Sequence, residues 1–327
     1  MGRLRVMWNM LQPVARRFAY QKGWKKIAGF QEEFGPLMKG MPLAEQQALY
    51  RRFTEYYVIL GFALHSMTTW WGRKATAREK KVAFYLAMAS PVYDDLNDLR
   101  ALTHEEMVDL MNRADSDRDA LENLLVYCCQ QAEAHYAQGD KFWDLLNRVG
   151  RLQDESLHQK GRDLSDEEIL SITTEKGAYA FLFIFHAFEH AMDAKEEEAV
   201  FQLGRLFQLS DDILDIYHDA REGIRTYPLS GCSLSDLRAK FLEWNQLVEK
   251  AFHTLPYPSE LIEAFILQIR LVTAPVMVAL DQYESLMGEQ GEVLKPEEYT
   301  RQELICDMEK PRNIGRALRY YWFGFVK

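Results

Sequence analysis

Two clusters of aspartates are the residues of this chain whose spacing could support chemistry. One lies in FQLSDDILDIYHDAREGIRTYP (207–228), where Asp211, Asp215 and Asp219 follow one another at intervals of four residues. Residues four apart share a face of an α-helix, and like charges at that spacing repel by roughly 0.2–0.5 kcal/mol per exposed pair. Because the neighbouring residues are mostly apolar, we expect this acidic face to need either solvent or a bound cation.

The other cluster lies in PVYDDLNDLR (91–100), directly after the apolar segment VAFYLAMAS. Asp94 and Asp98 are again four residues apart, and Asp95 lies beside them. A single acidic helix face is usually a solvated surface, but two such faces in apolar surroundings favour metal binding. Carboxylate oxygens suit Mg²⁺, which keeps several waters and links a few carboxylates to substrate phosphates. We therefore predict a set of Mg²⁺ ligands that comprises Asp94, Asp95, Asp98, Asp211, Asp212 and Asp215.

Two cations are placed to bind the phosphates of such a substrate. Lys176 lies in TTEKGAYAF, where the following Gly177 allows the helix to loosen and a ligand to approach. Arg225 follows the second acidic cluster in EGIRTYP. Each cation, taken singly, is more typical of a solvated surface. Near the acidic clusters, we expect both to bind a metal-held diphosphate and to act in catalysis with Asp94, Asp98 and Asp211.

The segment FQLSDDILDIYHD resembles the second aspartate-rich motif of trans-isoprenyl diphosphate synthases, which reads Q-x-x-D-D-x-x-D. Gln208, Asp211, Asp212 and Asp215 match this motif position by position. The segment DDLND (94–98) is similar to the first aspartate-rich motif of the same family. The order of the two motifs along the chain also agrees with the family.

A third stretch, DLSDEEILSITTEKGAYA (163–180), looks like the one that leads to the family's Lys-Thr pair. Lys176 matches the lysine, Gly177 replaces the threonine, and Arg225 stands where the family usually has a lysine after a glycine. The resemblance covers about residues 80–230. It implies the isoprenoid-synthase fold, an all-α, single-domain bundle of long helices around a deep apolar cavity. The two aspartate clusters would face each other at its mouth and hold Mg²⁺ ions that bind an allylic prenyl diphosphate.

The departures from the family concern the second substrate of its chain-elongating members. Those members have an Arg-Arg pair soon after the first motif, where this chain has only Arg100 in LRALTHEEMVDLM. Their upstream Gly-Lys-x-x-Arg stretch corresponds here to YRRFTEYYVIL (50–60), and the basic GRKATAREKK (72–81) is an imperfect substitute. This pattern resembles a class I terpene synthase, a lyase that ionises one prenyl diphosphate and cyclises or eliminates to a terpene, releasing diphosphate.

The remaining candidate residues would line the substrate. Arg319 and Tyr320 look like the Arg-Tyr pair that terpene synthases place over the diphosphate, although plain helix packing is the other interpretation. Ala89 and Ser90 are small and lie one turn before Asp94, so we expect the cavity to continue past them. Aromatic faces stabilise a carbocation, and the candidates are Phe84, Tyr85, Tyr179, Phe181 and Phe185, with core packing as the alternative. The predicted substrate-binding residues are Lys176, Gln208, Arg225, Tyr85, Ala89, Ser90, Arg319 and Tyr320.

Two alternatives to a terpene synthase remain open. One is a chain-elongating prenyl diphosphate synthase, or prenyltransferase, that binds its second diphosphate through other cations, namely Arg51, Arg52, Arg73 and Lys74. The other is a non-catalytic helical subunit that binds prenyl chains or a partner synthase. A scaffold has no reason to keep two repulsive acidic clusters, which argues against the latter.

Helical periodicity runs through almost the whole chain and positions these residues. We expect long helices and one domain over residues 1–327, with helices near 43–71, 75–101, 116–137, 139–161, 165–194, 195–222, 233–254 and 258–289. The breaks between them are short, and no alternating strand pattern stands out. The apolar segment GAYAFLFIFHAF (177–188) should lie at the centre of the bundle.

Composition limits the partners and the location of the protein. The net charge of −10 argues against nucleic-acid binding. The segment 1–31 nevertheless carries seven basic and no acidic residues, so peripheral contact with a membrane is one interpretation and a solvated end the other. We expect no membrane span and no disulfide among the four cysteines, which fits the cytoplasm. A second copy of the chain, in a homodimer, is a further partner that we consider.

Overall fold

The computed structural model of the protein describes residues 27–114, 117–161, 163–287 and 293–325, and most of these residues are helical. Within these ranges β-pairing is limited to two isolated bridges, Lys160–Ile224 and Ser233–Val293. The prediction of an all-α protein is confirmed. All seven cations of the basic segment 1–31 lie outside the described residues, as does any contact they would make with a membrane.

The chain divides into two compact units. Unit 1 comprises the chain up to Asn147 together with His186–Ala191, and unit 2 comprises Arg148–Phe185 together with the chain from Met192 onward. The first aspartate cluster therefore belongs to unit 1 and the second to unit 2. The single-domain organisation expected from the sequence stays a prediction.

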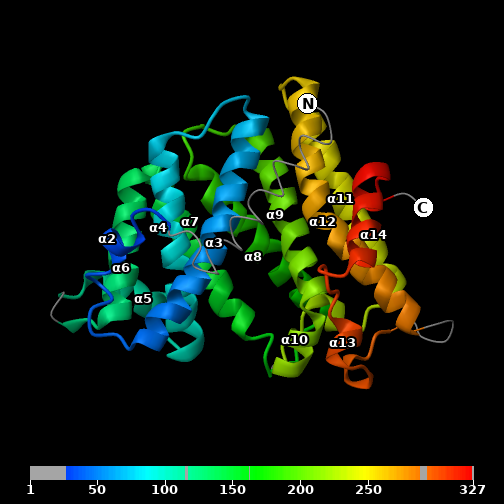
Figure 1. Cartoon of the computed structure of the whole chain (residues 1–327), viewed down its shortest axis with the longest axis horizontal. Helices are drawn as coiled ribbons and strands as arrows, with labels where there is room; N and C mark the ends of the chain where they lie inside the picture. The colour runs from blue at the N-terminus through cyan, green and yellow to red at the C-terminus, as the bar shows by residue number, and fades with distance from the viewer. Residues whose placement is uncertain (1–26, 115–116, 162, 288–292, 326–327) are drawn as a thin grey trace. The chain divides into compact units, whose positions relative to one another are not determined.

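Unit 1 is built around α4, which lies between α3 and α6 (Figure 1). A capping box formed by Thr76 and Glu79 starts α4. Glu79 is fully buried and paired with Arg73 at 2.5 Å, and it also accepts hydrogen bonds from the backbone of Thr76 and Glu189. The helices of this unit are α2 (Phe30–Phe34), α3 (Leu43–Trp70), α4 (Ala77–Asp94), the π-helix η1 (Asp95–Leu99), α5 (His104–Asn112), α6 (Ala120–His135) and the first part of α7 (Gly139–Leu157).

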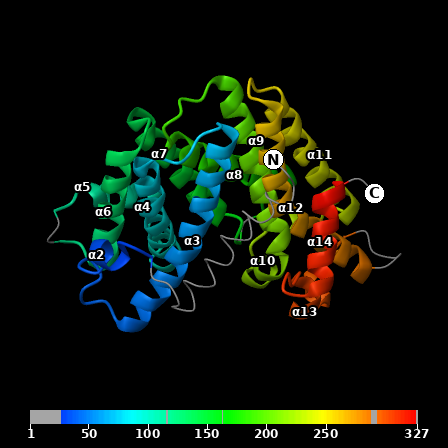
Figure 2. The ribbon, with the colours of Figure 1, turned by 45° about the horizontal axis from the view of Figure 1, so that its top comes forward.

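Unit 2 is a second helical bundle, in which α11 packs on α9 and α12, and α14 packs on α12 (Figure 2). Its elements are the last part of α7, α8 (Asp166–His186), α9 (Ala194–Leu214), α10 (Ile216–Glu222), η3 (Tyr227–Leu229), α11 (Leu234–His253), α12 (Ser259–Met287), η5 (Pro296–Glu298), α13 (Arg301–Leu304) and α14 (Pro311–Phe323). We expected no segment with the length and apolarity of a membrane span, and this is wrong for α12. By length and composition, α12 could cross a membrane. However, 67% of its most apolar window is buried within the protein, as in a core helix.

The boundaries differ from the expected ones at two places that matter for the site. The helix predicted over 165–194 ends at His186, and α9 begins after Asp193, whose side chain caps the helix together with Glu196. The helix predicted over 195–222 is interrupted at Asp215, which separates α9 from α10. The second acidic cluster thus spans the end of one helix and the start of another.

Helices α8 and α9 approach each other closely through two glycines. A Cβ atom at Gly204 would lie 2.7 Å from the Cα of Ala178 and closer still to the carbonyl oxygen of Gly177. A Cβ atom at Gly177 would lie 2.6 Å from the Cβ of Gln208. The expectation that Gly177 loosens its helix is not met, because α8 runs continuously through it. Gly177 instead lets the α9 backbone come into contact.

Replacing Gly204 with Ala should lower the free energy of unfolding by about 1–3 kcal/mol, because the methyl group has no room. Gly315→Ala is the matched control, since nothing lies within 4 Å of its added Cβ in α14. That change should raise the free energy of unfolding by about 0.5–1 kcal/mol. Chemical denaturation measures both, and a Gly204→Ala protein as stable as the wild type would contradict the close crossing.

Candidate functional site

Asp212 is the anchored member of the second acidic cluster. Its side chain is buried, at 6% exposure, and accepts hydrogen bonds from Thr173 Oγ1 of α8 and from Gln208 Nε2, both at 2.9 Å. Thr173 lies one turn before Gly177, so the glycine crossing brings its hydroxyl to the carboxylate. Gln208, which the sequence predicts to bind substrate, supports Asp212 in this structure.

Asp211 and Asp215 are exposed, and neither carboxylate forms a hydrogen bond or ion pair with another described residue. The chain turns at Asp215, whose carbonyl accepts hydrogen bonds from the backbone of His218 at 2.8 Å and Asp219 at 3.0 Å. The Asp219 carboxylate accepts a hydrogen bond from Thr226 at 3.2 Å. The acidic stripe is therefore the exposed Asp211 and Asp215 together with the half-buried Asp219, with Asp212 turned inward.

The carboxylates of this stripe raise one another's pKa values. Burial, followed by repulsion from Asp212, Asp215 and Asp211, raises the pKa of Asp219 to about 7. Asp211 retains solvent contact, yet the dense protein around it and the charges of Asp215 and Asp212 raise its pKa to about 6. The cluster holds more negative charge than the surrounding protein neutralises.

Lys176 is the cation that acts on this cluster. Its charge lowers the pKa of both Asp211 and Asp212, against the larger effect of burial. Its ammonium group donates a hydrogen bond to Ser156 Oγ at 3.2 Å and forms no ion pair within the described residues. The structure thus brings the charge of Lys176 within reach of Asp211 and Asp212, and the predicted role of these residues in binding metal and substrate stays a prediction.

Arg225 is directed elsewhere. Its guanidinium donates to the carbonyl oxygen of Leu164 at 2.5 Å and pairs with Asp166 at 3.2 Å and Asp163 at 3.5 Å. Its backbone N–H donates to the carbonyl oxygen of Gln159 at 2.9 Å. These contacts tie Arg225 to the loop between α7 and α8, and its predicted role at the diphosphate stays untested.

Two carboxylates of the first acidic cluster form ion pairs within unit 1. Arg52 of α3 forms ion pairs with Asp95 and, at 3.2 Å, with Asp94, and Tyr56 donates to Asp94 at 2.7 Å. Asp98 lies in the π-helix η1 and is exposed. The two clusters therefore differ: Arg52 forms ion pairs with two carboxylates of the first, whereas Asp211 and Asp215 of the second form no ion pair with another described residue.

The residues predicted to line a prenyl chain are part of the packing of unit 1. Tyr85 is buried at 4% exposure, and its ring lies against Phe34, Phe84 and Tyr127. Ala89 is buried next to it on α4, and Ser90 donates a hydrogen bond to the Leu86 carbonyl. The predicted role of these residues in substrate binding stays a prediction.

Arg319 and Tyr320 line a different pocket of unit 2, with a volume of about 540 Å³. The Tyr320 hydroxyl donates to Asp281 at 2.7 Å, and the same carboxylate pairs with Arg238 at 2.8 Å and Arg316 at 2.7 Å. Asp281 is thus neutralised by two cations. The structure places Arg319 and Tyr320 at this α12–α14 network and shows no contact between them and the described carboxylates at 211–219.

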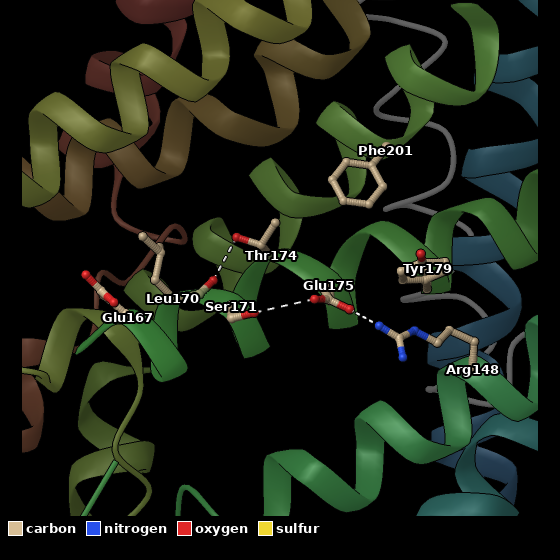
Figure 3. Close-up of a pocket in the computed structure, with 8 residues that line it drawn as sticks. All are labelled: Arg148, Glu167, Leu170, Ser171, Thr174, Glu175, Tyr179 and Phe201. Atoms are coloured by element: carbon tan, nitrogen blue, oxygen red, sulfur yellow. Dashed lines mark hydrogen bonds and ion pairs between the residues drawn. The ribbon is translucent and has the colours of Figure 1, made fainter. Parts of the chain in front are cut away.

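A second pocket, of about 520 Å³, lies along α8 (Figure 3). Its only lining cation, Arg148, pairs with Glu175 and lies 4.9 Å from the centre of the Tyr179 ring. The lining residues of α8 recur on one side of the helix, and Thr173 and Lys176 lie on another. The pocket is therefore separate from the acidic stripe; its lining comprises Arg148, Glu167, Leu170, Ser171, Thr174, Glu175, Tyr179 and Phe201.

Comparisons with known proteins add no assignment, because no family model, curated protein or solved structure matches the chain. Among the described residues, no group of three or more His, Cys, Asp or Glu side chains forms a ready metal cage. The donors fit Mg²⁺ in another way, because this ion usually takes one or two carboxylates and completes its shell with water and phosphate. Asp211 and Asp215 present oxygens suited to that kind of shared shell.

The sequence did not reveal the partners that orient the aspartates. Thr173 of α8, and Arg52 and Tyr56 of α3, are distant in sequence from the carboxylates that they contact. The spacing of Arg52 and Tyr56, four residues apart on one helix face, is the only signal that pointed to a shared partner. Asp219 was visible as part of the stripe but absent from the predicted ligands.

Replacing Thr173 with Val should lower the free energy of unfolding by about 1–3 kcal/mol, because the buried Asp212 loses one of its two donors. Thr174→Val is the control, since the Thr174 hydroxyl only bonds the Leu170 carbonyl of its own helix. Its effect should stay within about 0.5 kcal/mol. Equal losses in the two variants, measured by urea denaturation, would remove the anchoring role of Thr173.

Asp219 should make the metal-free protein less stable as the pH rises. Its pKa of about 7 in the folded protein exceeds its ordinary value, so folding binds a proton more tightly. The resulting stabilisation is complete below about pH 4 and is lost as the pH rises through about 7. Asp219→Asn should therefore flatten the fall of Tm over this range. A Tm profile parallel to that of the wild type would show that Asp219 is not perturbed.

Proposed function

We propose that the protein is a Mg²⁺-dependent class I terpene synthase that ionises a prenyl diphosphate and converts it to a terpene with release of diphosphate. One observation carries this: Asp211 and Asp215 are exposed and form no ion pair with another described residue, and the charge of Lys176 acts on Asp211 and Asp212, on helices that Thr173, Gln208 and two glycines hold together. Uncompensated carboxylates next to a cation suit a ligand that brings both metal ions and phosphates.

Bound Mg²⁺ would neutralise the negative charge that develops on the departing diphosphate. The carboxylates of Asp211 and Asp215 would hold the ion, with Asp219 one turn further along the stripe. The buried hydrogen bonds to Asp212 would keep the end of α9 in place during binding. Asp94, Asp95 and Asp98 remain the second predicted ligand set within this proposal.

In the ionisation, the bond between the allylic carbon and the diphosphate oxygen breaks, and both electrons leave with the diphosphate. Lys176 would bind the phosphate oxygens as their charge grows, so its effect would be larger in the transition state than in the bound substrate. The allylic carbocation then loses a proton to the released diphosphate, either directly or after closing a ring.

An aromatic pair lies close to these charged groups in the sequence. Phe181 of α8 follows Lys176 by little more than one turn, and Phe207 of α9 precedes Asp211 by one turn. The two ring centres lie 5.0 Å apart, and Phe181 also stacks with Phe185 at 6.0 Å. Such faces would shield and stabilise cationic carbon. The deep apolar cavity of an isoprenoid-synthase fold is part of this proposal.

The state of the unit 1 cations favours one diphosphate substrate over two. A chain-elongating enzyme would use cations such as Arg52 and Arg73 for its second diphosphate. Arg52 pairs with Asp94 and Asp95, and Arg73 pairs with the buried Glu79. A second diphosphate would have to displace these carboxylates, which would cost the ion pairs already formed.

The test is incubation of the protein with Mg²⁺ and C10, C15, C20 or longer prenyl diphosphates, with and without isopentenyl diphosphate. A hydrocarbon or alcohol formed from one substrate alone is expected, with loss of activity on chelation. A longer diphosphate that appears only with isopentenyl diphosphate would establish chain elongation instead. If no product forms under any condition, a non-catalytic prenyl-binding subunit is the remaining interpretation.

Asp211→Asn should lower kcat by about 100-fold or more, because it removes a carboxylate that holds the metal. Glu198→Gln is the matched control: it removes the same charge from an exposed position of the same helix. It should keep near-wild-type turnover. Circular dichroism verifies that both variants fold, and full activity of the Asp211→Asn protein would exclude this aspartate from the mechanism.

A further inference from the structure

A buried tyrosine of α12 holds the end of α9. Tyr283 has no solvent exposure, and its hydroxyl oxygen lies 3.1 Å from the carbonyl oxygens of both Ile213 and Leu304. A tyrosine hydroxyl donates one hydrogen, so the two carbonyls share it. Ile213 belongs to the last turn of α9, and Leu304 is the last residue of α13.

The Ile213 carbonyl needs this donor because of the break at Asp215. The last four carbonyls of an α-helix lack partners within the helix, and a buried carbonyl without a donor is costly. Ile213 is fully buried, so it depends on a protein donor. Tyr283 supplies one from a different helix and thereby fixes the point where α9 gives way to α10.

The neighbouring Gln282 shows that this part of α12 is an anchoring point. Its side-chain amide donates to the carbonyl oxygens of Glu303 at 2.6 Å and Ile305 at 3.4 Å. Gln282 and Tyr283 thus secure the carbonyl end of α13, and Tyr283 also reaches α9. Both α9 and α13 end on a core helix that is itself buried over most of its length.

We infer, building on the Mg²⁺-dependent function proposed above, that Tyr283 is a positioning residue for the metal. Asp211 precedes the break, Asp215 forms it, and Asp219 follows it, so the conformation at Asp215 sets the spacing of the three carboxylates. Mg²⁺ demands a near-octahedral shell with bonds of about 2.0–2.1 Å, which tolerates little error in that spacing. Tyr283 touches neither metal nor substrate and acts through the Ile213 backbone.

The test compares Tyr283→Phe with Tyr257→Phe. Each removes one tyrosine hydroxyl bonded to α9: that of Tyr283 at the end of the helix, and that of Tyr257 at Glu196 in its first turn. The readout is the rise of Tm as Mg²⁺ is titrated in the presence of inorganic diphosphate. Tyr283→Phe should raise the half-saturating Mg²⁺ concentration by about tenfold or more. Tyr257→Phe should lower the metal-free Tm without moving that concentration.

Equal half-saturating concentrations in the wild type and Tyr283→Phe would overturn the inference. A wild type whose Tm does not respond to Mg²⁺ would overturn the proposed function as well, so the two failures are distinguishable. Hydrogen exchange of the metal-free wild type provides a check that needs no variant. The His218 and Asp219 amides should exchange slowly because the break is held in place, and exchange at the rate of an unstructured chain would contradict the role of Tyr283.

Discussion

The contact between Gly177 and Gly204 is the constraint on which the acidic site depends. Any larger side chain at either position would collide with the backbone of the facing helix. At this short separation the Thr173 hydroxyl reaches Asp212, and Lys176 acts on Asp211. A wider crossing would leave the buried Asp212 without one of its two donors and would move the cation away from the cluster.

Charge balance distinguishes the two aspartate clusters that look alike in the sequence. In unit 1, Arg52 forms ion pairs with both Asp94 and Asp95, so these two carboxylates share one cation. In unit 2, Lys176 is the one cation among the described residues whose charge lowers the pKa of Asp211 and Asp212, and the pKa of Asp211 is raised despite it. Repulsion that the protein leaves in place is a reason to bind a cation, and it favours the second cluster as the functional one.

Helix ends matter more for this site than helix interiors. Asp215 occupies the break between α9 and α10, where backbone groups lack partners within a helix and take them from elsewhere. Tyr283 of α12 meets that need at Ile213. Rigid support from a buried core helix is what allows exposed carboxylates at a helix end to keep a defined spacing.

The sequence by itself determined the all-α architecture, most of the long helices and the acidic stripe at Asp211, Asp215 and Asp219. These features depend on residues close together in the chain, through helical periodicity and four-residue spacing. It could not determine that α8 ends at His186, because the next two residues, Ala187 and Phe188, are also apolar. The next helix start, at the Asp193 cap, lies further along the chain.

Only the tertiary structure decided which charges are compensated. Arg52 lies more than forty residues from the aspartates it neutralises, and Thr173 lies 39 residues from Asp212. It also decided that Gly177 is a packing contact, that Arg225 binds the α7–α8 loop, and that Tyr320 binds Asp281. The physical reason is that hydrogen bonds and ion pairs between helices depend on how the helices cross, and local sequence spacing carries no information about that crossing.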